Sequence, residues 1–304
     1  MDHVHIPGLS GSLSPVALGF EFFDDLEQAA PLLDAYRTAG GNLFDTAHVY
    51  GKGVTESVFG QWHTSRGARS ELVVIGKGAH TPHCTPDTIG GQLAESLDRM
   101  KTDYVDVYFM HRDDPKVPVG EFVDAMDAEA DAGRIRGPFG GSNWTMERMD
   151  EAIAYAQKNG KRRPAAISNN FSLAEMLDPI WPGCVTSSGA AWKAWLRERQ
   201  MPVFAWSSQA RGFFTDRAGR DRRDDAELVR VWYSQENFAR RDRAVELAGR
   251  LGRKPIHIAL AYVLAQPFPA IPLIGPRRLD ELADSLSALD VALSPEEVTW
   301  LEQG

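Results

Sequence analysis

The stretch FDTAHVYG, residues 44–51, places an acid at the end of an apolar run and a tyrosine five residues later. Its first residues belong to the run NLFDT at 42–46, which we interpret as a short strand. Asp45 stands where this strand ends, and Tyr50 stands in the segment that follows it. We therefore expect the strand to end at a polar site that holds both side chains.

Short runs of this kind recur along the whole chain and alternate with longer amphipathic segments. Helical patterns such as those at 26–40 and 146–160 end at glycine, which is a common helix exit. Strands that alternate with helices predict βαβ units and a parallel sheet. The eight strand-like runs are PVALGF (15–20), NLFDT (42–46), LVVIGK (72–77), YVDVYFMH (104–111), RGPFGGSN (136–143), AAISNN (165–170), PVFAWSS (202–208) and AIPLIG (270–275).

Eight such units without a break in composition predict one parallel eight-stranded (β/α)8 barrel, a TIM barrel, as a single domain over residues 1–304. In this fold the active site lies at the rim formed by the carboxyl ends of the strands. A doubly wound open sheet is the alternative. It usually carries G-x-G-x-x-G after the first strand, and that spacing does not occur in this chain.

Composition narrows the class of protein. The 304 residues carry a formal net charge of −9, which argues against non-specific binding to nucleic acid or to anionic membranes. Two isolated cysteines suit a reducing compartment. The N-terminal residues lack a basic region followed by an apolar one, and no run reaches membrane-spanning length. We expect a soluble, cytoplasmic protein.

The ends of three successive runs point to a shared site. In the run at 104–111, alternation places His111 on the same face as apolar residues, and the same parity holds for Lys77 and Asp45 in their own runs. Neighbouring strands lie about 4.8 Å apart. Asp45, Lys77 and His111 can therefore meet, and Tyr50 can fold over them from its loop.

These four residues predict a proton donor. Free tyrosine has a pKa near 10, and a neighbouring ammonium would lower it by favouring the phenolate. Asp45 can serve as the counter-ion of Lys77, and His111 can donate a hydrogen bond to a substrate oxygen. Each residue alone would more often be a solvated charge or a packing residue. Four on three successive strands with matching parity favour the catalytic interpretation.

The motifs GGNLFDTAHVYG, LVVIGKG and DVYFMHRDDP resemble those of the aldo-keto reductase family. The family's catalytic tetrad would be Asp45, Tyr50, Lys77 and His111 in this chain, and the similarity runs from about Ser14 to the end. The resemblance implies a (β/α)8 barrel that binds NADP(H) without a Rossmann motif. It also implies the reduction of an aldehyde or ketone, with Tyr50 as the general acid.

The resemblance further implies the contacts of the cofactor. Ser142 and Asn143 would hold the nicotinamide carboxamide, with Ser168 where many members carry glutamine. Trp206 would stack on the nicotinamide, as an aromatic residue does there in the family. Asp284 and Ser285 stand where the family often has Glu-Asn. The remaining contacts, along the pyrophosphate and at the adenosine phosphate, would be Ser207, Gln209, Arg211, Gly275, Arg277, Glu281, Asp284 and Ser285.

The arginine pair Arg277 and Arg278 follows the last strand and precedes a helix. An arginine at that place can hold the 2′-phosphate that NADPH has and NADH lacks. We therefore expect a preference for NADPH, with either arginine as the contact. An ordinary pair of surface charges is the alternative.

Other interpretations are weaker. His80, His83 and Cys84 could suggest a metal, but a zinc site needs three or four placed ligands, and we interpret this segment as a substrate loop without a metal. A barrel isomerase or aldolase would not need Tyr50 and Asp45 in these positions. A non-catalytic subunit that senses nicotinamide cofactors is the alternative from another class. The sequence predicts a small carbonyl substrate without identifying it.

Overall fold

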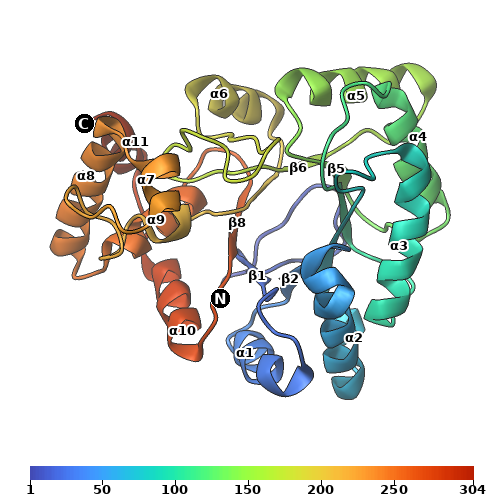
Figure 1. Ribbon diagram of the computed structural model, residues 1–304, viewed down its shortest axis with the longest axis horizontal. Helices are drawn as coiled ribbons and strands as arrows, with labels where there is room; N and C mark the ends of the chain where they lie inside the picture. Colours follow the sequence, from blue (N-terminus) through green and yellow to red (C-terminus); the bar gives the residue numbers. More distant parts are fainter. The chain divides into compact units, whose positions relative to one another are not determined.

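Eight short parallel strands form a closed barrel in chain order from β1 to β8, in a computed structural model that describes residues 1–304 (Figure 1). The predicted (β/α)8 fold is confirmed, and the open sheet is wrong. The strands are β1 (Ala17–Gly19), β2 (Leu43–Asp45), β3 (Val73–Gly78), β4 (Val107–Met110), β5 (Phe139–Ser142), β6 (Ala166–Ser168), β7 (Val203–Ala205) and β8 (Ala270–Ile274).

Helices follow most of the strands, as the alternating sequence pattern predicts. None of them combines the length and the apolar character that crossing a bilayer requires. The α-helices are α1 (Leu26–Thr38), α2 (Val54–Arg66), α3 (Pro86–Met100), α4 (Val119–Asp131), α5 (Met146–Asn159), α6 (Ala190–Arg199), α7 (Ala226–Trp232), α8 (Gln235–Leu251), α9 (Pro255–Leu264), α10 (Leu279–Ser287) and α11 (Pro295–Gln303). Four short 3₁₀ helices complete the elements: η1 (Tyr50–Gly53), η2 (Arg69–Glu71), η3 (Ala210–Gly212) and η4 (Ala288–Asp290).

The contacts within the chain define two compact units. Unit 1 comprises Met1–Ser168 together with Gly275–Leu279, and unit 2 comprises Asn169–Ile274 together with Asp280–Gly304. Unit 1 therefore holds β1 to β6, and unit 2 holds β7 and β8. The assignment of the whole chain to a single domain stays a prediction.

In unit 1, α1 to α5 pack one against the next along the outside of the strands (Figure 1). Parallel strands are covered on both faces, and the residues of β2, β4, β5 and β6 are accordingly all buried. Behind β2 an aromatic cluster fills the layer between strand and helices: the ring of Phe44 lies 5.2–5.4 Å from those of Tyr36, Phe59 and Trp62. This packing fixes the strand that ends at Asp45.

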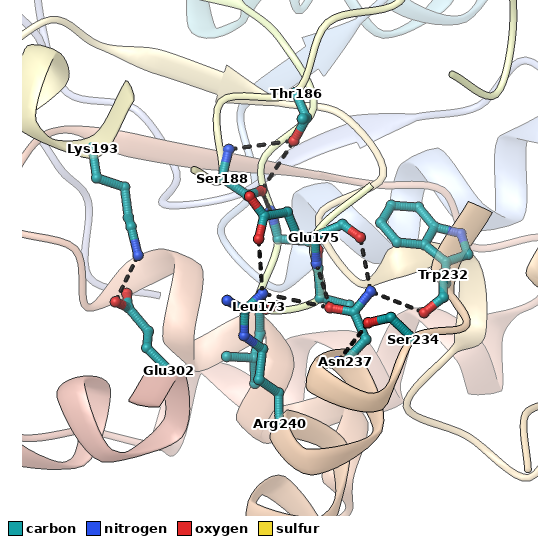
Figure 2. Close-up of polar contacts among 12 residues, drawn as sticks. Leu173, Glu175, Thr186, Ser188, Lys193, Trp232, Ser234, Asn237, Arg240 and Glu302 are labelled. Carbon is teal, nitrogen blue, oxygen red and sulfur yellow. Dashed lines mark hydrogen bonds and ion pairs between the residues drawn. The ribbon is translucent and has the colours of Figure 1, made fainter. Parts of the chain in front are cut away.

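In unit 2, α8 holds the long segment that follows β6 (Figure 2). The Asn237 amide donates from Nδ2 to the carbonyls of Glu175 and Trp232, at 2.8 and 2.9 Å, and its Oδ1 accepts from the Glu175 amide at 2.8 Å. Arg240, one turn further along α8, donates to the Leu173 carbonyl at 3.3 Å. Asn237 is buried, so these bonds replace water for backbone groups that belong to no strand.

Candidate active site

Lys77 and Asp45 form a buried ion pair at the ends of β3 and β2. The Lys77 Nζ lies 2.5 Å from the Asp45 Oδ1, and the two residues are only 3% and 4% exposed. The register pairs Asp45 with Ile75, so Lys77 stands two residues further along and its side chain extends back to the carboxylate. Burial disfavours the ammonium, but Asp45 and Tyr50 together, through their charge and their hydrogen bonds, outweigh this effect and raise the pKa of Lys77 above its ordinary value.

Tyr50 reaches the ion pair because the chain after β2 continues to follow β3. The amide of Thr46 donates to the Ile75 carbonyl at 3.0 Å, and the amide of His48 donates to the Lys77 carbonyl at 2.8 Å. Tyr50 then opens η1, and its hydroxyl accepts a hydrogen bond from the Lys77 Nζ at 3.2 Å. The ammonium has donors only, so the hydroxyl hydrogen of Tyr50 is directed away from Lys77.

His111 stands directly after β4, where its amide donates to the Gly78 carbonyl at 2.6 Å. Its ring lies 5.7 Å from that of Tyr50, at an angle of 80°. Burial and the positive charges of Lys77, His80 and Arg112 hold the pKa of His111 well below its usual value. The imidazole is therefore neutral near pH 7 and can donate one N–H. Its Nδ1 is buried without a hydrogen-bond partner.

The pKa of Tyr50 differs from the expectation. Burial raises it to about 12, and the carboxylates of Asp45 and Glu21 add to this effect, while Lys77 opposes it. Lys77 does lower the pKa of Tyr50, as predicted, but the predicted net direction is wrong because the pKa is raised overall. Burial, which the sequence does not report, exceeds the effect of the ammonium. Tyr50 is protonated at neutral pH.

The ends of β5 and β6 carry a buried cluster of polar side chains. Ser142 donates from Oγ to the Ser168 carbonyl at 2.7 Å, and the Asn143 Nδ2 donates to the Ser142 Oγ at 3.1 Å. Asn143 has a positive φ of 61°, which is strained for a residue other than glycine. The Ser168 Oγ is fully buried without a hydrogen-bond partner. An unpartnered hydroxyl beside an amide suits a ligand with amide groups, such as the nicotinamide carboxamide.

Unit 2 contains the predicted stacking residue and the pyrophosphate segment. The indole of Trp206 lies 6.4 Å from that of Trp181, and its Nε1 is buried without a partner. Ser207 and Arg211 both have positive φ angles, 49° and 51°. Arg211 donates from Nε to Glu227 at 2.6 Å, and Gln209 donates to the Ile256 carbonyl at 3.4 Å.

The predicted adenosine-phosphate residues fall in both units. In unit 1, the guanidinium of Arg277 lies 4.2 Å from the ring centre of Phe22, and Gly275 approaches the same ring. In unit 2, α10 carries the other three residues, Glu281, Asp284 and Ser285. The carboxylate of Asp284 accepts from Lys254 at 2.5 Å and lies 3.0 Å from the His257 Nε2.

Glu21 was not assigned a place in the site from the sequence, and His80 was assigned only to the expected substrate loop. Glu21 follows β1 and acts on the pKa of Tyr50 through its charge. His80 follows β3, and its ring lies 4.9 Å from that of His111 at 82°. Cys84 donates to the Ala79 carbonyl at 3.2 Å, and no group of three metal-ligating side chains is present around it or elsewhere. Glu21 and His80 are polar residues that follow a strand end by two positions, and this placement is the feature of the sequence that could have assigned them to the site.

The comparisons with known proteins show the family and the fold. Residues 21–303 match the model of the Aldo/keto reductase family. An uncharacterized oxidoreductase, YrpG, of Bacillus subtilis (strain 168) is 27% identical over 97% of this chain and 93% of its own length. The aryl-alcohol dehydrogenase [NADP(+)] of Phanerodontia chrysosporium is 28% identical over 97% of this chain and 83% of its own length.

Two solved structures share the fold. The thermostable aldo-keto reductase Tm1743, crystallised with the inhibitor epalrestat, has a TM-score of 0.78 at 22% identity, with 99% of both chains covered. The glycerol dehydrogenase AKR11B4 from Gluconobacter oxydans has a TM-score of 0.77 at 22% identity, with 99% of this chain and 94% of that chain covered. The match of the family model over nearly the whole length identifies this chain as a member of the aldo/keto reductase family of oxidoreductases.

Proposed function

We propose that this protein reduces an aldehyde or ketone to an alcohol with NADPH, and that Tyr50 supplies the proton. The observation that carries the proposal is the chain of contacts from Asp45 through Lys77 to Tyr50, with Nζ–Oδ1 and Nζ–Oη distances of 2.5 and 3.2 Å. The family uses nicotinamide cofactors, and the Phanerodontia relative is named for NADP(+).

In the proposed reaction, each tetrad residue of unit 1 has a separate role. When bound, the reduced cofactor supplies a hydride to the carbonyl carbon. The carbonyl oxygen gains negative charge and takes the proton of Tyr50, which becomes a phenolate. The Lys77 ammonium stabilises this phenolate, and Asp45 keeps Lys77 charged. The neutral His111 donates a hydrogen bond that orients the carbonyl oxygen.

Residues in each unit fit the cofactor. In unit 1, Ser142, Asn143 and Ser168 would bind the carboxamide, and the unpartnered Ser168 hydroxyl supports this assignment. In unit 2, Trp206 would stack on the nicotinamide. The pyrophosphate and the adenosine phosphate would contact Ser207, Gln209, Arg211, Gly275, Arg277, Glu281, Asp284 and Ser285.

A panel of aldehydes and ketones, including aryl aldehydes and sugar derivatives, tests the proposal with NADPH and NADH as alternative reductants. We expect at least one carbonyl class to be reduced, with consumption of NADPH equal to the alcohol formed. The test variant is Lys77→Met, which removes the ammonium beside Tyr50. Its control is Lys158→Met, which removes an ammonium on α5, far along the chain. Equal turnover in both variants would contradict the role of Lys77.

A further inference from the structure

Tyr50 begins a segment whose backbone needs support from outside. The three residues after it, Gly51, Lys52 and Gly53, all have positive φ angles of 54°, 55° and 92°. Lys52 is not a glycine, so its conformation is strained and persists only where surrounding contacts hold it. The position of the Tyr50 hydroxyl against Lys77 therefore depends on groups that hold this segment.

Arg99, in the last turn of α3, makes those contacts. Its Nη1 donates to the carbonyl of His48 at 3.3 Å and to the Glu56 Oε2 at 3.1 Å. Its Nη2 donates to the Glu95 Oε2 at 3.2 Å. His48 precedes Tyr50 by two residues and Glu56 follows it by six, so one guanidinium joins both sides of the tyrosine.

His48 links this arrangement to the catalytic lysine. Its Nε2 lies 2.8 Å from the same Glu95 oxygen that Arg99 contacts, and its amide donates to the Lys77 carbonyl at 2.8 Å. The segment is thus held on one side by β3 and on the other by α3. His48 takes part in both contacts, because its amide bonds to β3 and its carbonyl accepts from Arg99 on α3.

Gly53 shows how closely Arg99 approaches. A Cβ built on Gly53 would lie 2.7 Å from the Cζ and Nη1 of Arg99, and its φ of 92° also disfavours any side chain. The backbone conformation disfavours any other residue here, and a side chain would also force the Arg99 guanidinium to move away.

Glu56 gives Arg99 an anchor that the bulk solvent cannot replace. Its carboxylate is fully buried, and Oε1 has no hydrogen-bond partner. Burial raises the pKa of Glu56 above its ordinary value, while Ser96 and Arg99 oppose this effect. A buried carboxylate holds its cationic partner firmly because separation would leave an unpaired charge.

We propose that Arg99 is a positioning residue for Tyr50: it joins His48, Glu56 and Glu95 around the segment that carries the tyrosine and so fixes the phenol hydroxyl against Lys77. This inference rests on the proposed role of Tyr50 as the proton donor. Arg99 itself contacts none of the four tetrad side chains. Its loss is expected to lower turnover roughly 10- to 100-fold, the scale that a displacement of about 1 Å produces, without changing cofactor affinity.

A neighbouring cavity makes a chemical test possible. Arg99, Lys52, Gly53, Asp25 and Ser57 line a cavity of about 270 Å³, and the Arg99 side chain is 27% exposed. Arg99→Ala would therefore leave a space that a small guanidinium ion can enter from solvent. Ethylguanidinium can then bind beside Glu56 and restore the missing donors.

The experiment compares Arg99→Ala with Arg66→Ala. Arg66 ends the neighbouring helix α2 and pairs with the carboxylate of Asp34 on α1, so its loss removes a different arginine–carboxylate pair. We expect a loss of kcat in Arg99→Ala alone, an unchanged dissociation constant for NADPH, and recovery of kcat with millimolar ethylguanidinium but not with tetramethylammonium. Turnover equal to that of the parent, or equal losses in both variants, would overturn the inference.

A double-mutant cycle separates this inference from the proposed function. In a Tyr50→Phe background the further change Arg99→Ala should cost nothing more, because Arg99 acts through Tyr50. Additive losses would show that Arg99 acts elsewhere and would overturn its positioning role. Full activity of Tyr50→Phe alone would contradict the proposed function instead. If Arg99→Ala does not fold, Arg99→Lys replaces it, because it keeps the charge near Glu56 and loses the fork that also reaches His48.

Discussion

At the scale of single residues, burial and neighbouring charge act in different directions on the groups of the site. Lys77 keeps its charge because Asp45 lies 2.5 Å away, whereas burial and the positive charges of Lys77, His80 and Arg112 lower the pKa of His111 and hold it neutral. Tyr50 lies between these cases, because burial raises its pKa and Lys77 opposes the rise. A neutral imidazole, a protonated phenol and one fixed cation are the states that the proposed reduction of a carbonyl would use.

The neutral state of His111 predicts how stability depends on pH. An unfolded histidine binds a proton below about pH 6.5, but folded His111, with its lowered pKa, does not. The unfolded state then binds more protons, so the stability that His111 contributes is present above pH 6.5 and is lost as pH falls below it. For one proton the slope is about 1.4 kcal/mol per pH unit.

Urea unfolding at a series of pH values from 7.5 to about 5 measures this effect. We expect the free energy of unfolding of the parent to fall more steeply with acid than that of His111→Asn. The other titrating groups are common to both proteins and cancel in the comparison. Parallel curves would show that the pKa of His111 is the same in the folded and unfolded states, which contradicts the lowered pKa.

The guanidinium of Arg277, which lies against Phe22, is expected to set the choice of cofactor. A charge-assisted hydrogen bond contributes about 1.5–3 kcal/mol, so Arg277→Ala should weaken NADPH binding roughly ten- to hundredfold and leave NADH nearly unaffected. The two dissociation constants, measured by fluorescence titration in parent and variant, test this. Arg278→Ala tests the other arginine of the pair, and an unchanged ratio in Arg277→Ala would exclude the role of Arg277.

At the scale of elements, side-chain hydrogen bonds hold the segments between strands and helices. Arg99 on α3 holds the segment that carries Tyr50, and Asn237 on α8 holds the segment after β6 (Figure 2). Arg148 on α5 does the same after β4, where its Nη2 donates to the Val117 carbonyl at 2.7 Å. These segments have few backbone partners of their own, so a helix side chain supplies the missing donors.

Asn237→Ala is expected to destabilise unit 2. The substitution leaves the Glu175 amide and two carbonyls without partners in a buried place. One such unsatisfied group costs about 1–3 kcal/mol, and the free energy of unfolding should fall by at least this amount. Asn159→Ala is the control: its amide is exposed and bonds only to Tyr155 within its own helix, so the change should stay within about 0.5 kcal/mol. Equal effects in urea unfolding would contradict the account of α8.

At the scale of the whole molecule, alternation of strands and helices was enough to predict the barrel, and parity was enough to bring three residues together. Asp45, Lys77 and His111 end successive strands on one face, which a sequence can report because side chains alternate along a strand. Arg99 and Glu21 escaped prediction because their contacts depend on the conformations of segments between elements. The net direction of the Tyr50 pKa was wrong because it depends on burial.

The sequence also predicted the family, and the family model over residues 21–303 confirms it. It could not predict the substrate, because we expect the residues that select it in segments such as 79–85 and 169–189, whose side chains follow no periodic pattern. Their conformations are set by individual hydrogen bonds such as those of Cys84 and Asn237. The periodicity of the sequence predicts helices and strands, whereas individual contacts set the conformations of the segments between them.

The central claim is that Tyr50 donates the proton, and Tyr50→Phe tests it most directly. The change keeps the ring beside Lys77 and removes only the hydroxyl. With a carbonyl that the parent reduces, we expect turnover to fall roughly 10²- to 10⁴-fold, while the dissociation constant for NADPH stays within a factor of about two. Tyr104→Phe, in which the ring lies between Arg69 and Arg136, should behave like the parent. Turnover of Tyr50→Phe within a few-fold of the parent would contradict the account.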